Sequence, residues 1–390
     1  MNFKKYISVI LCLLSVQLLF PERTYSEVTD SSKPPQIKAS AACLMEVATG
    51  QIHFEKEGDK RREPASLTKV MTSIVAIEKG NLKDVVTVPQ RAARVSMGQD
   101  IGLNTGDKLY LEDLLKAALL YSANDSTVAI GEHIGGNHDQ FIKMMNDQAA
   151  ALGMKNTSLA NTNGFHHPNH YTTANDLATL TCYALKNKTF AEFVRTKEAT
   201  ITWLPKVTDT TTTEDEEKTP PKQRTLRSTN RLLHSDFEGI DGVKTGTTPR
   251  AGNCLIASAT REGRQLVVVI LNSNNRWNDA TRLLEYGFNE VERRVLIEKD
   301  EVVSEIQVLE GVETRVALVT ANRVEAYVAS MDSDKIESRI TRNPIPRAPI
   351  KQGDKLGKMV FVLNDKEIGT VDLIANQHIE RLAWYKRIFD

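Results

Sequence analysis

The spacing of apolar residues divides the chain into a region of mixed helices and strands, followed by a region of short strands. Six segments of the first region show helical spacing or length: 66–80, 111–121, 125–134, 138–152, 173–187 and 276–288. Two β-like runs flank Thr49-Gly50 between 39 and 54, and two more lie at 253–260 and 265–272, which predicts antiparallel hairpins. Helices combined with antiparallel hairpins predict an α+β class for this region.

The second region, from about 292 to 374, consists of short β-branched runs separated by turns, which predicts a small all-β domain. These runs are 302–309, 314–319, 324–329, 359–363 and 370–374. The last segment, 376–390, returns to helical spacing, with basic residues beside its apolar stripe. We expect an amphipathic helix there, whose apolar side either faces a membrane or docks on the protein itself.

Two polar stretches lie outside these elements. Residues 27–36 contain two prolines and predict a linker. Residues 206–223 have almost no apolar content and predict an exposed insertion.

The N-terminus has the features of a secretory signal. Lys4 and Lys5 precede an apolar run over 6–20, and Thr24 and Ser26 follow at positions suited to cleavage. We expect a signal peptide over 1–26, with an uncleaved anchor helix as the alternative. In both cases the body of the protein is exported and lies outside the cytoplasm, in the periplasm or its equivalent.

Composition removes some classes of function. Lys plus Arg and Asp plus Glu each number 50 in 390 residues, so the net charge is zero and no nucleic-acid partner is indicated. Outside the signal, Cys43, Cys182 and Cys254 form an odd, widely spaced set, which argues against a disulfide framework.

The histidines His166, His167 and His170 cluster in a polar stretch beside Pro168. A metal site is one interpretation. Loop polarity is the other, which we prefer because no thiol or carboxylate motif accompanies the histidines.

The segment PASLTKVMT places Ser66 and Lys69 one helical turn apart, where two side chains share a helix face. A serine hydroxyl is a weak nucleophile without a base, and lysine can act as that base when burial or a nearby cation lowers its pKa.

Two further motifs could complete such a site. Ser122 and Asn124 follow an apolar helical run; Ser122 could relay a proton and Asn124 could bond a peptide backbone, although for this motif alone a helix-end cap or turn is the preferred explanation. The strand-like segment GIDGVKTGTT contains Lys244, Thr245, Gly246 and Thr247. Lys244 would lower the pKa of Lys69 and attract a carboxylate, the two threonines would bond that carboxylate, and Gly246 would let a substrate backbone approach. Backbone N–H groups of Ser66 and Thr247 could form an oxyanion hole.

The order SxxK, SxN, KTG resembles that of the penicillin-binding and serine β-lactamase superfamily. Several further segments closely resemble the low-molecular-mass D-alanyl-D-alanine carboxypeptidases of peptidase family S11: NRLL at 230–233, AGNCLIAS at 251–258, LANTNGFHHPNHYTTANDLATL at 159–180 and APIKQGDKLG at 348–357.

This resemblance implies a transpeptidase-like catalytic domain over 37–290, a β-domain over 291–375 and a membrane-binding helix over 376–390. It also implies that Ser66 forms an acyl-enzyme and removes the terminal D-alanine from the pentapeptide stem of peptidoglycan. Lys69 and Ser122 would be the other catalytic residues, and β-lactams would acylate the same serine. No metal or organic cofactor is implied.

One departure from the family concerns the carboxylate. The family often has an arginine where this chain has Gln265, and the adjacent Arg264 faces the opposite side of a strand, so the carboxylate contact is incomplete in the sequence.

Three alternatives stay open. A class A β-lactamase would need a deacylating glutamate that we do not find, and it would lack the β-domain. A D,D-endopeptidase that cuts crosslinks generally lacks that domain as well. A non-catalytic protein that binds peptidoglycan or β-lactams would usually have lost a motif residue.

Overall fold

The computed structural model describes residues 34–205 and 221–383. The expected signal peptide, most of the linker and of the 206–223 insertion, and the end of the C-terminal segment lie outside these residues. No helix within the described ranges is long and apolar enough to cross a membrane.

The first region is built on a five-stranded antiparallel sheet with strand order β2-β1-β9-β8-β7. Its strands are β1 (Ala41–Glu46), β2 (Ile52–Lys56), β7 (Ile240–Thr248), β8 (Gly252–Arg261) and β9 (Arg264–Leu271). The hairpins expected around Thr49-Gly50 and over 253–272 are confirmed.

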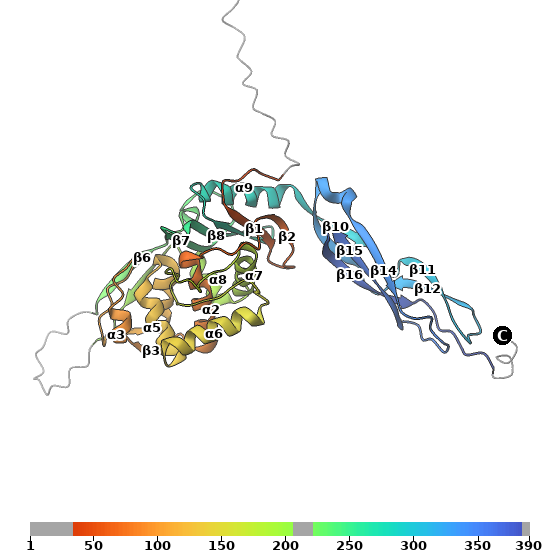
Figure 1. Ribbon diagram of the computed structural model, residues 1–390, viewed down its shortest axis with the longest axis horizontal. Coiled ribbons are helices and arrows are strands. Elements are labelled where there is room, and N and C mark those ends of the chain that lie inside the picture. Colours follow the sequence, from red (N-terminus) through yellow and green to blue (C-terminus); the bar gives the residue numbers. More distant parts are fainter. Residues whose placement is uncertain (1–33, 206–220, 384–390) are drawn as a thin grey trace, which may run out of the picture. The chain divides into compact units, whose positions relative to one another are not determined.

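Helices cover both faces of this sheet (Figure 1). Because side chains alternate along a strand, Val267 and Val269 enter one core and Leu266 and Val268 enter the other. The first core also contains α2 (Lys69–Lys79) and α7 (Ala174–Leu185), and the second contains α9 (Arg276–Asn289). This layering confirms the predicted α+β class.

The other helices of the region are α3 (Gln90–Ala93), α4 (Leu111–Lys116), α5 (Asn124–Gly135), α6 (His138–Ala151) and α8 (Lys188–Arg195). A π-helical turn, Ala117–Tyr121, continues α4, and short 3-10 helices span Ala65–Thr68 and Arg231–His234. Two small hairpins pair β3 (Val85–Thr87) with β4 (Lys108–Tyr110) and β5 (Glu198–Thr202) with β6 (Gln223–Arg227). The sequence pattern predicted the longer helices but not α3, α8 or the strands β3, β4, β5 and β6.

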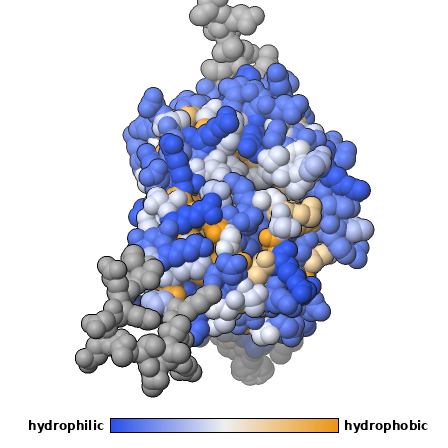
Figure 2. Space-filling model, turned by 90° about the vertical axis from the view of Figure 1, so that its left-hand side faces the viewer, coloured by the Kyte–Doolittle hydropathy of each residue, from blue (hydrophilic) through white to orange (hydrophobic). Residues whose placement is uncertain are grey.

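The face of this region shown in Figure 2 is mostly hydrophilic. Among the described residues on that face, hydrophobic side chains appear only in small groups. Cys43, Cys182 and Cys254 are free thiols buried in the interior.

The second region is all β, as predicted. Strand β10 (Val291–Ile297) pairs with β13 (Val324–Ala329). A second sheet has the order β11-β12-β16-β15-β14, formed by Val302–Gln307, Arg315–Thr320, Lys366–Ala375, Lys355–Leu363 and Glu337–Arg342. A 3-10 helix spans Ser330–Lys335. Strand β14 was not predicted, because all six of its residues are exposed and it has no buried alternate face.

The C-terminal segment corrects one expectation. Residues 376–383 do not form a helix; instead Ile379 pairs with Ile350, and Arg381 with Gly311, in isolated β-bridges. Ile379 is 1% exposed and belongs to the core of the β-domain. One of the apolar residues that suggested an amphipathic stripe is therefore a core residue of this domain. Residues 384–390 lie outside the described part of the chain.

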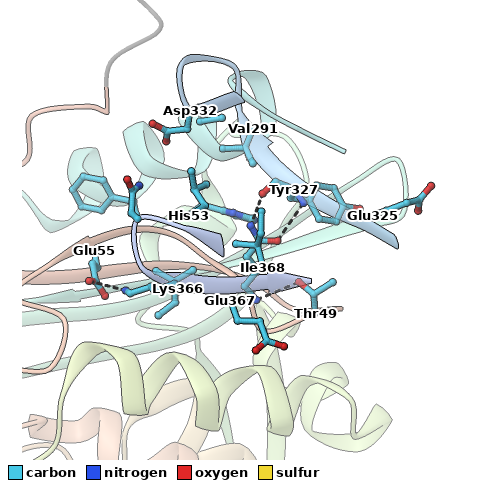
Figure 3. Close-up of a pocket in the computed structure, with 17 residues that line it drawn as sticks. Thr49, His53, Glu55, Val291, Glu325, Tyr327, Asp332, Lys366, Glu367 and Ile368 are labelled. Atoms are coloured by element: carbon cyan, nitrogen blue, oxygen red, sulfur yellow. Dashed lines mark hydrogen bonds and ion pairs between the residues drawn. The ribbon is translucent and has the colours of Figure 1, made fainter. Parts of the chain in front are cut away.

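A pocket lies where the β1–β2 hairpin meets β13 and the turn between β15 and β16 (Figure 3). Beside it, the side chain of Gln51 donates to the Tyr327 carbonyl oxygen and accepts from the Tyr327 N–H group at 3.2 Å. Lys366 pairs with Glu55 at 2.8 Å, and the Arg264 guanidinium lies 4.3 Å from the centre of the Tyr327 ring. Backbone-directed hydrogen bonds and one ion pair thus link the β-domain to the first hairpin, and a cation–π contact links it to β9.

Phe141 on α6 is completely buried, and its ring and backbone fill the space that the glycines Gly131 and Gly135 leave on α5. We expect Phe141→Ala to lower the free energy of unfolding by about 3–5 kcal/mol, because the truncation leaves a cavity between two helices. Chemical denaturation followed by circular dichroism measures this loss. The half-buried neighbour Ile142 provides the control, since Ile142→Ala should cost clearly less. A Phe141→Ala variant as stable as the wild type would contradict the packing described here.

Candidate active site

Ser66 lies in the 3-10 turn that leads into α2, beside strand β7. The fit is tight: a side chain at Gly246 would place its Cβ 3.0 Å from the Ser66 nitrogen. On the other side, Gly164 has φ +91°, and a Cβ there would lie 1.8 Å from the Ala65 carbonyl oxygen. Glycine at both positions lets three segments of backbone meet around the serine.

Lys69 begins α2 directly after this turn and is fully buried. Its Nζ lies 2.9 Å from Ser66 Oγ, 2.7 Å from Asn124 Oδ1 and 3.0 Å from the Asn163 carbonyl oxygen. Burial, and next the positive charge of Lys244, hold the pKa of Lys69 well below its ordinary value, against a smaller opposing effect of Asp125. The pair predicted from helical spacing is therefore assembled, with the amine in a state suited to accepting a proton.

The second motif lies at the junction of the π-helical turn and α5. Ser122 adopts a left-handed backbone conformation (φ 69°) and lines the same cleft as Ser66. Both groups of the Asn124 side chain are engaged, because Oδ1 accepts from Lys69 and Nδ2 donates to the Met97 carbonyl oxygen at 2.9 Å. Asn124 thus fixes the lysine and ties the segment around Met97 to the cleft.

The third motif runs along β7. Lys244 is 1% exposed and donates to the Thr245 carbonyl oxygen at 3.0 Å. Burial, and secondarily the charge of Arg276, lower its pKa to about 7. Thr245, Gly246 and Thr247 line the cleft, and Thr245 shares a hydrogen bond of 2.6 Å with Thr229. Lys244 therefore lies beneath the cleft, whereas its three neighbours face it.

Arg276, at the start of α9, was not identified from the sequence. Its Nη1 atom lies 3.0 Å from the Gly246 carbonyl oxygen and 3.0 Å from Thr247 Oγ1, and the residue lines the cleft. The only sequence signal was its position at the predicted start of helix 276–288, which says nothing about its tertiary neighbours.

Gln265 and Arg264 do not reach the cleft. Gln265 Nε2 donates to Asp241 at 2.8 Å, and Arg264 pairs with the buried carboxylate of Glu46 at 2.9 Å. The cation that lines the cleft is Arg276, and neither residue 264 nor residue 265 contributes to the lining.

The described residues that line the cleft include one cation, Arg276, and no carboxylate. The buried amine of Lys244 lies beneath the cleft and adds positive charge when protonated. A cleft with this charge pattern favours a substrate that ends in a carboxylate.

The histidines bind separate partners. His170 is buried; its Nδ1 accepts from the Ala160 N–H at 2.9 Å, its Nε2 lies 2.8 Å from Thr68 Oγ1, and burial lowers its pKa to about 4. His166 lies between Glu63 and Arg250. The described ranges contain no group of three or more His, Cys, Asp or Glu residues placed to hold a metal ion.

The chain matches two family models. Residues 28–275 match D-alanyl-D-alanine carboxypeptidase, peptidase family S11, and residues 292–381 match the C-terminal domain of penicillin-binding protein 5.

Individual relatives extend over almost the whole chain. D-alanyl-D-alanine carboxypeptidase DacF of Bacillus subtilis is 30% identical over 356 residues, which cover 89% of this chain and 87% of the relative. DacC of Escherichia coli is 30% identical over 370 residues, covering 91% and 88%. The crystal structure of DacD from Francisella tularensis superposes with a TM-score of 0.72 at 28% identity, covering 90% of this chain and 95% of that one. The matched family and the length of these similarities confirm the resemblance seen in the motifs: the chain belongs to the D-alanyl-D-alanine carboxypeptidase family, S11.

Proposed function

We propose that this protein removes the terminal D-alanine from peptidoglycan pentapeptide stems through an acyl-enzyme on Ser66. The observation that carries this proposal is the buried Lys69 amine, 2.9 Å from Ser66 Oγ, whose hydrogen-bond partners include no carboxylate and whose pKa is held well below its ordinary value by burial. A neutral lysine at hydrogen-bond distance is a competent general base for a serine hydroxyl.

In the proposed reaction, Ser66 Oγ attacks the carbonyl carbon between the two D-alanines while Lys69 takes the hydroxyl proton. Backbone N–H groups of Ser66 and Thr247 stabilise the oxyanion. Ser122 passes a proton to the leaving nitrogen, D-alanine departs, and water then hydrolyses the ester. β-Lactams acylate the same oxygen.

In this proposal, residues of strand β7 and Arg276 on α9 bind the substrate. Thr245 and Thr247 offer hydroxyls to the terminal carboxylate, and Gly246 lets the substrate backbone approach. Arg276 supplies a charge-assisted hydrogen bond to that carboxylate, a stronger interaction than a neutral one. The main role of Asn124 is to orient Lys69. To bond the substrate as well, the Asn124 side chain would have to give up its hydrogen bond to Lys69 or to the Met97 carbonyl oxygen.

The proposed setting is outside the cytoplasm. It is supported by the charged, apolar and small-residue pattern of residues 1–26 and by a family that acts on cell-wall peptides. Contact of the C-terminal segment with a membrane surface stays a prediction from the composition of its last residues.

The proposal is tested with a pentapeptide stem and mass spectrometry of the product. We expect the wild type to release a single alanine and Ser66→Ala to release none and to lose labelling by a fluorescent penicillin. The control is Ser73→Ala, which removes a buried hydroxyl on the same helix and should keep both activities. Cleavage of crosslinked dimers only would indicate an endopeptidase, and an unlabelled wild type would indicate a non-catalytic protein.

The charge of Lys244 should set the pH range of acylation. Lys69 works as a base only when neutral, so the acylation rate rises as the pH passes upward through the lowered pKa of Lys69. Lys244→Met removes a nearby positive charge, so the pKa of Lys69 should rise and the acid side of the pH–rate profile should move to higher pH. Lys244→Arg keeps the charge and is the matched control. A profile that stays in place in Lys244→Met would contradict this role.

Arg276→Ala should reduce kcat/KM for the pentapeptide roughly 10- to 100-fold, the effect of losing a charged hydrogen-bond partner worth about 1.5–3 kcal/mol. Steady-state kinetics measure the change, which should be smaller for a substrate whose terminal carboxylate is amidated. Gln265→Ala should have little effect, because Gln265 bonds Asp241 away from the cleft. Equal losses with the free and amidated substrates would rule out a carboxylate contact.

A further inference from the structure

Three side chains, Glu63, His166 and Arg250, are hydrogen-bonded in a row beside the cleft. His166 Nδ1 lies 2.7 Å from Glu63 Oε1, and His166 Nε2 lies 2.8 Å from Arg250 Nη1. The residues are far apart in the sequence, so only the fold brings them together.

The chemistry of the two ends fixes the state of the imidazole. A guanidinium can only donate, so Nε2 must accept from Arg250; a carboxylate can only accept, so Nδ1 must carry the proton given to Glu63. This arrangement requires a neutral ring with its proton on Nδ1. An imidazolium, which donates from both nitrogens, would lose its bond to Arg250.

Each of the three residues belongs to a segment that forms the cleft. Glu63 lies three positions before Ser66, which belongs to the 3-10 turn Ala65–Thr68. His166 follows Gly164 and Phe165, which line the cleft, and Asn163 in the same loop accepts from Lys69. Arg250 lies two positions beyond Thr248, the last lining residue of β7.

We propose that His166 is a positioning residue that holds these three segments in register and thereby sets the distance from the β7 wall to Ser66 and Lys69. This inference rests on the proposed acyl-enzyme function. His166 touches neither the reacting atoms nor the substrate, and acts through the Ser66 turn and the end of β7.

The hydrogen-bonded row of Glu63, His166 and Arg250 is better suited to positioning the cleft segments than to raising the free energy of unfolding. The side chains of His166 and Glu63 are 36% and 25% exposed, and exposed pairs of this kind add little to folding. Catalysis is more sensitive, because small displacements of reacting groups reduce rates strongly. A variant at this position should therefore remain folded while its reaction slows.

The test compares side chains of different hydrogen-bond polarity at position 166 in the full-length protein. His166→Gln retains one donor and one acceptor, whereas His166→Lys can donate to Glu63 but cannot accept from Arg250. His166→Ala has neither, and His167→Ala is the control for an exposed neighbouring histidine. The measurements are the acylation rate constant with a fluorescent penicillin, kcat and KM for the pentapeptide, and Tm.

We expect His166→Ala and His166→Lys, which both lose the hydrogen bond to Arg250, to lower the acylation rate constant roughly three- to tenfold. His166→Gln should stay within about twofold of the wild type, and Tm should change little in all variants. Adding Arg250→Ala to His166→Ala should cause no further loss, because the two residues act through one bond.

Equal rates in His166→Gln and His166→Lys, or full activity in His166→Ala, would overturn the inference. Additive losses in the double variant would do the same. Failure of the acyl-enzyme function, on which this inference rests, looks different, since the wild type itself would then take up no penicillin.

Discussion

The organisation of the catalytic region depends on how the buried amine of Lys69 is accommodated. A lysine removed from water needs hydrogen-bond partners, and a carboxylate partner would hold it protonated and inert as a base. Here the partners are a hydroxyl, a side-chain amide and a main-chain carbonyl, on Ser66, Asn124 and Asn163. These uncharged partners satisfy the hydrogen-bonding groups of the amine without supplying a negative charge that would hold its proton. Because each comes from a different segment, the helix, the α4–α5 junction and the loop after α6 must all meet at one nitrogen.

The charged side chains around the cleft are likewise arranged without a carboxylate among the described lining residues. The chain as a whole has no net charge, yet three basic side chains, Lys69, Lys244 and Arg276, converge around the cleft while the described lining contains no carboxylate. Lys244 is buried so deeply that its own pKa falls to about 7, so part of its effect on Lys69 disappears in mildly alkaline solution. The net charge of a sequence therefore carries no information about the local field that a fold creates.

The sequence predicted what local periodicity encodes and missed what only packing creates. Ser66 and Lys69 could be paired because one helical turn joins them, and the long helices and core strands follow from their apolar spacing. Strand β14 has no buried face, so its sequence shows no alternation of apolar and polar residues that would predict a strand. Ile379 has helical spacing but is held by Ile350 in the β-domain core, which explains the wrong helix assignment. Arg276 contacts Gly246 and Thr247 from a helix about thirty positions away in the sequence, so its role cannot be predicted from local spacing. Asn163 acts through its main-chain carbonyl oxygen, which every residue has, so its identity does not indicate the role.

The close approach of Gly164 to Ala65 also bears on when reactivity arises. The serine obtains its base and its neighbouring strand only after the loop before α7, the turn before α2 and the late strand β7 have come together, and these segments span nearly the entire catalytic region of the chain. In a chain that is still folding, the serine lacks this base and is an ordinary weak nucleophile. Under the proposed acyl-enzyme function, covalent capture of a β-lactam therefore depends on the finished fold, and the amount captured would report how many molecules have completed folding.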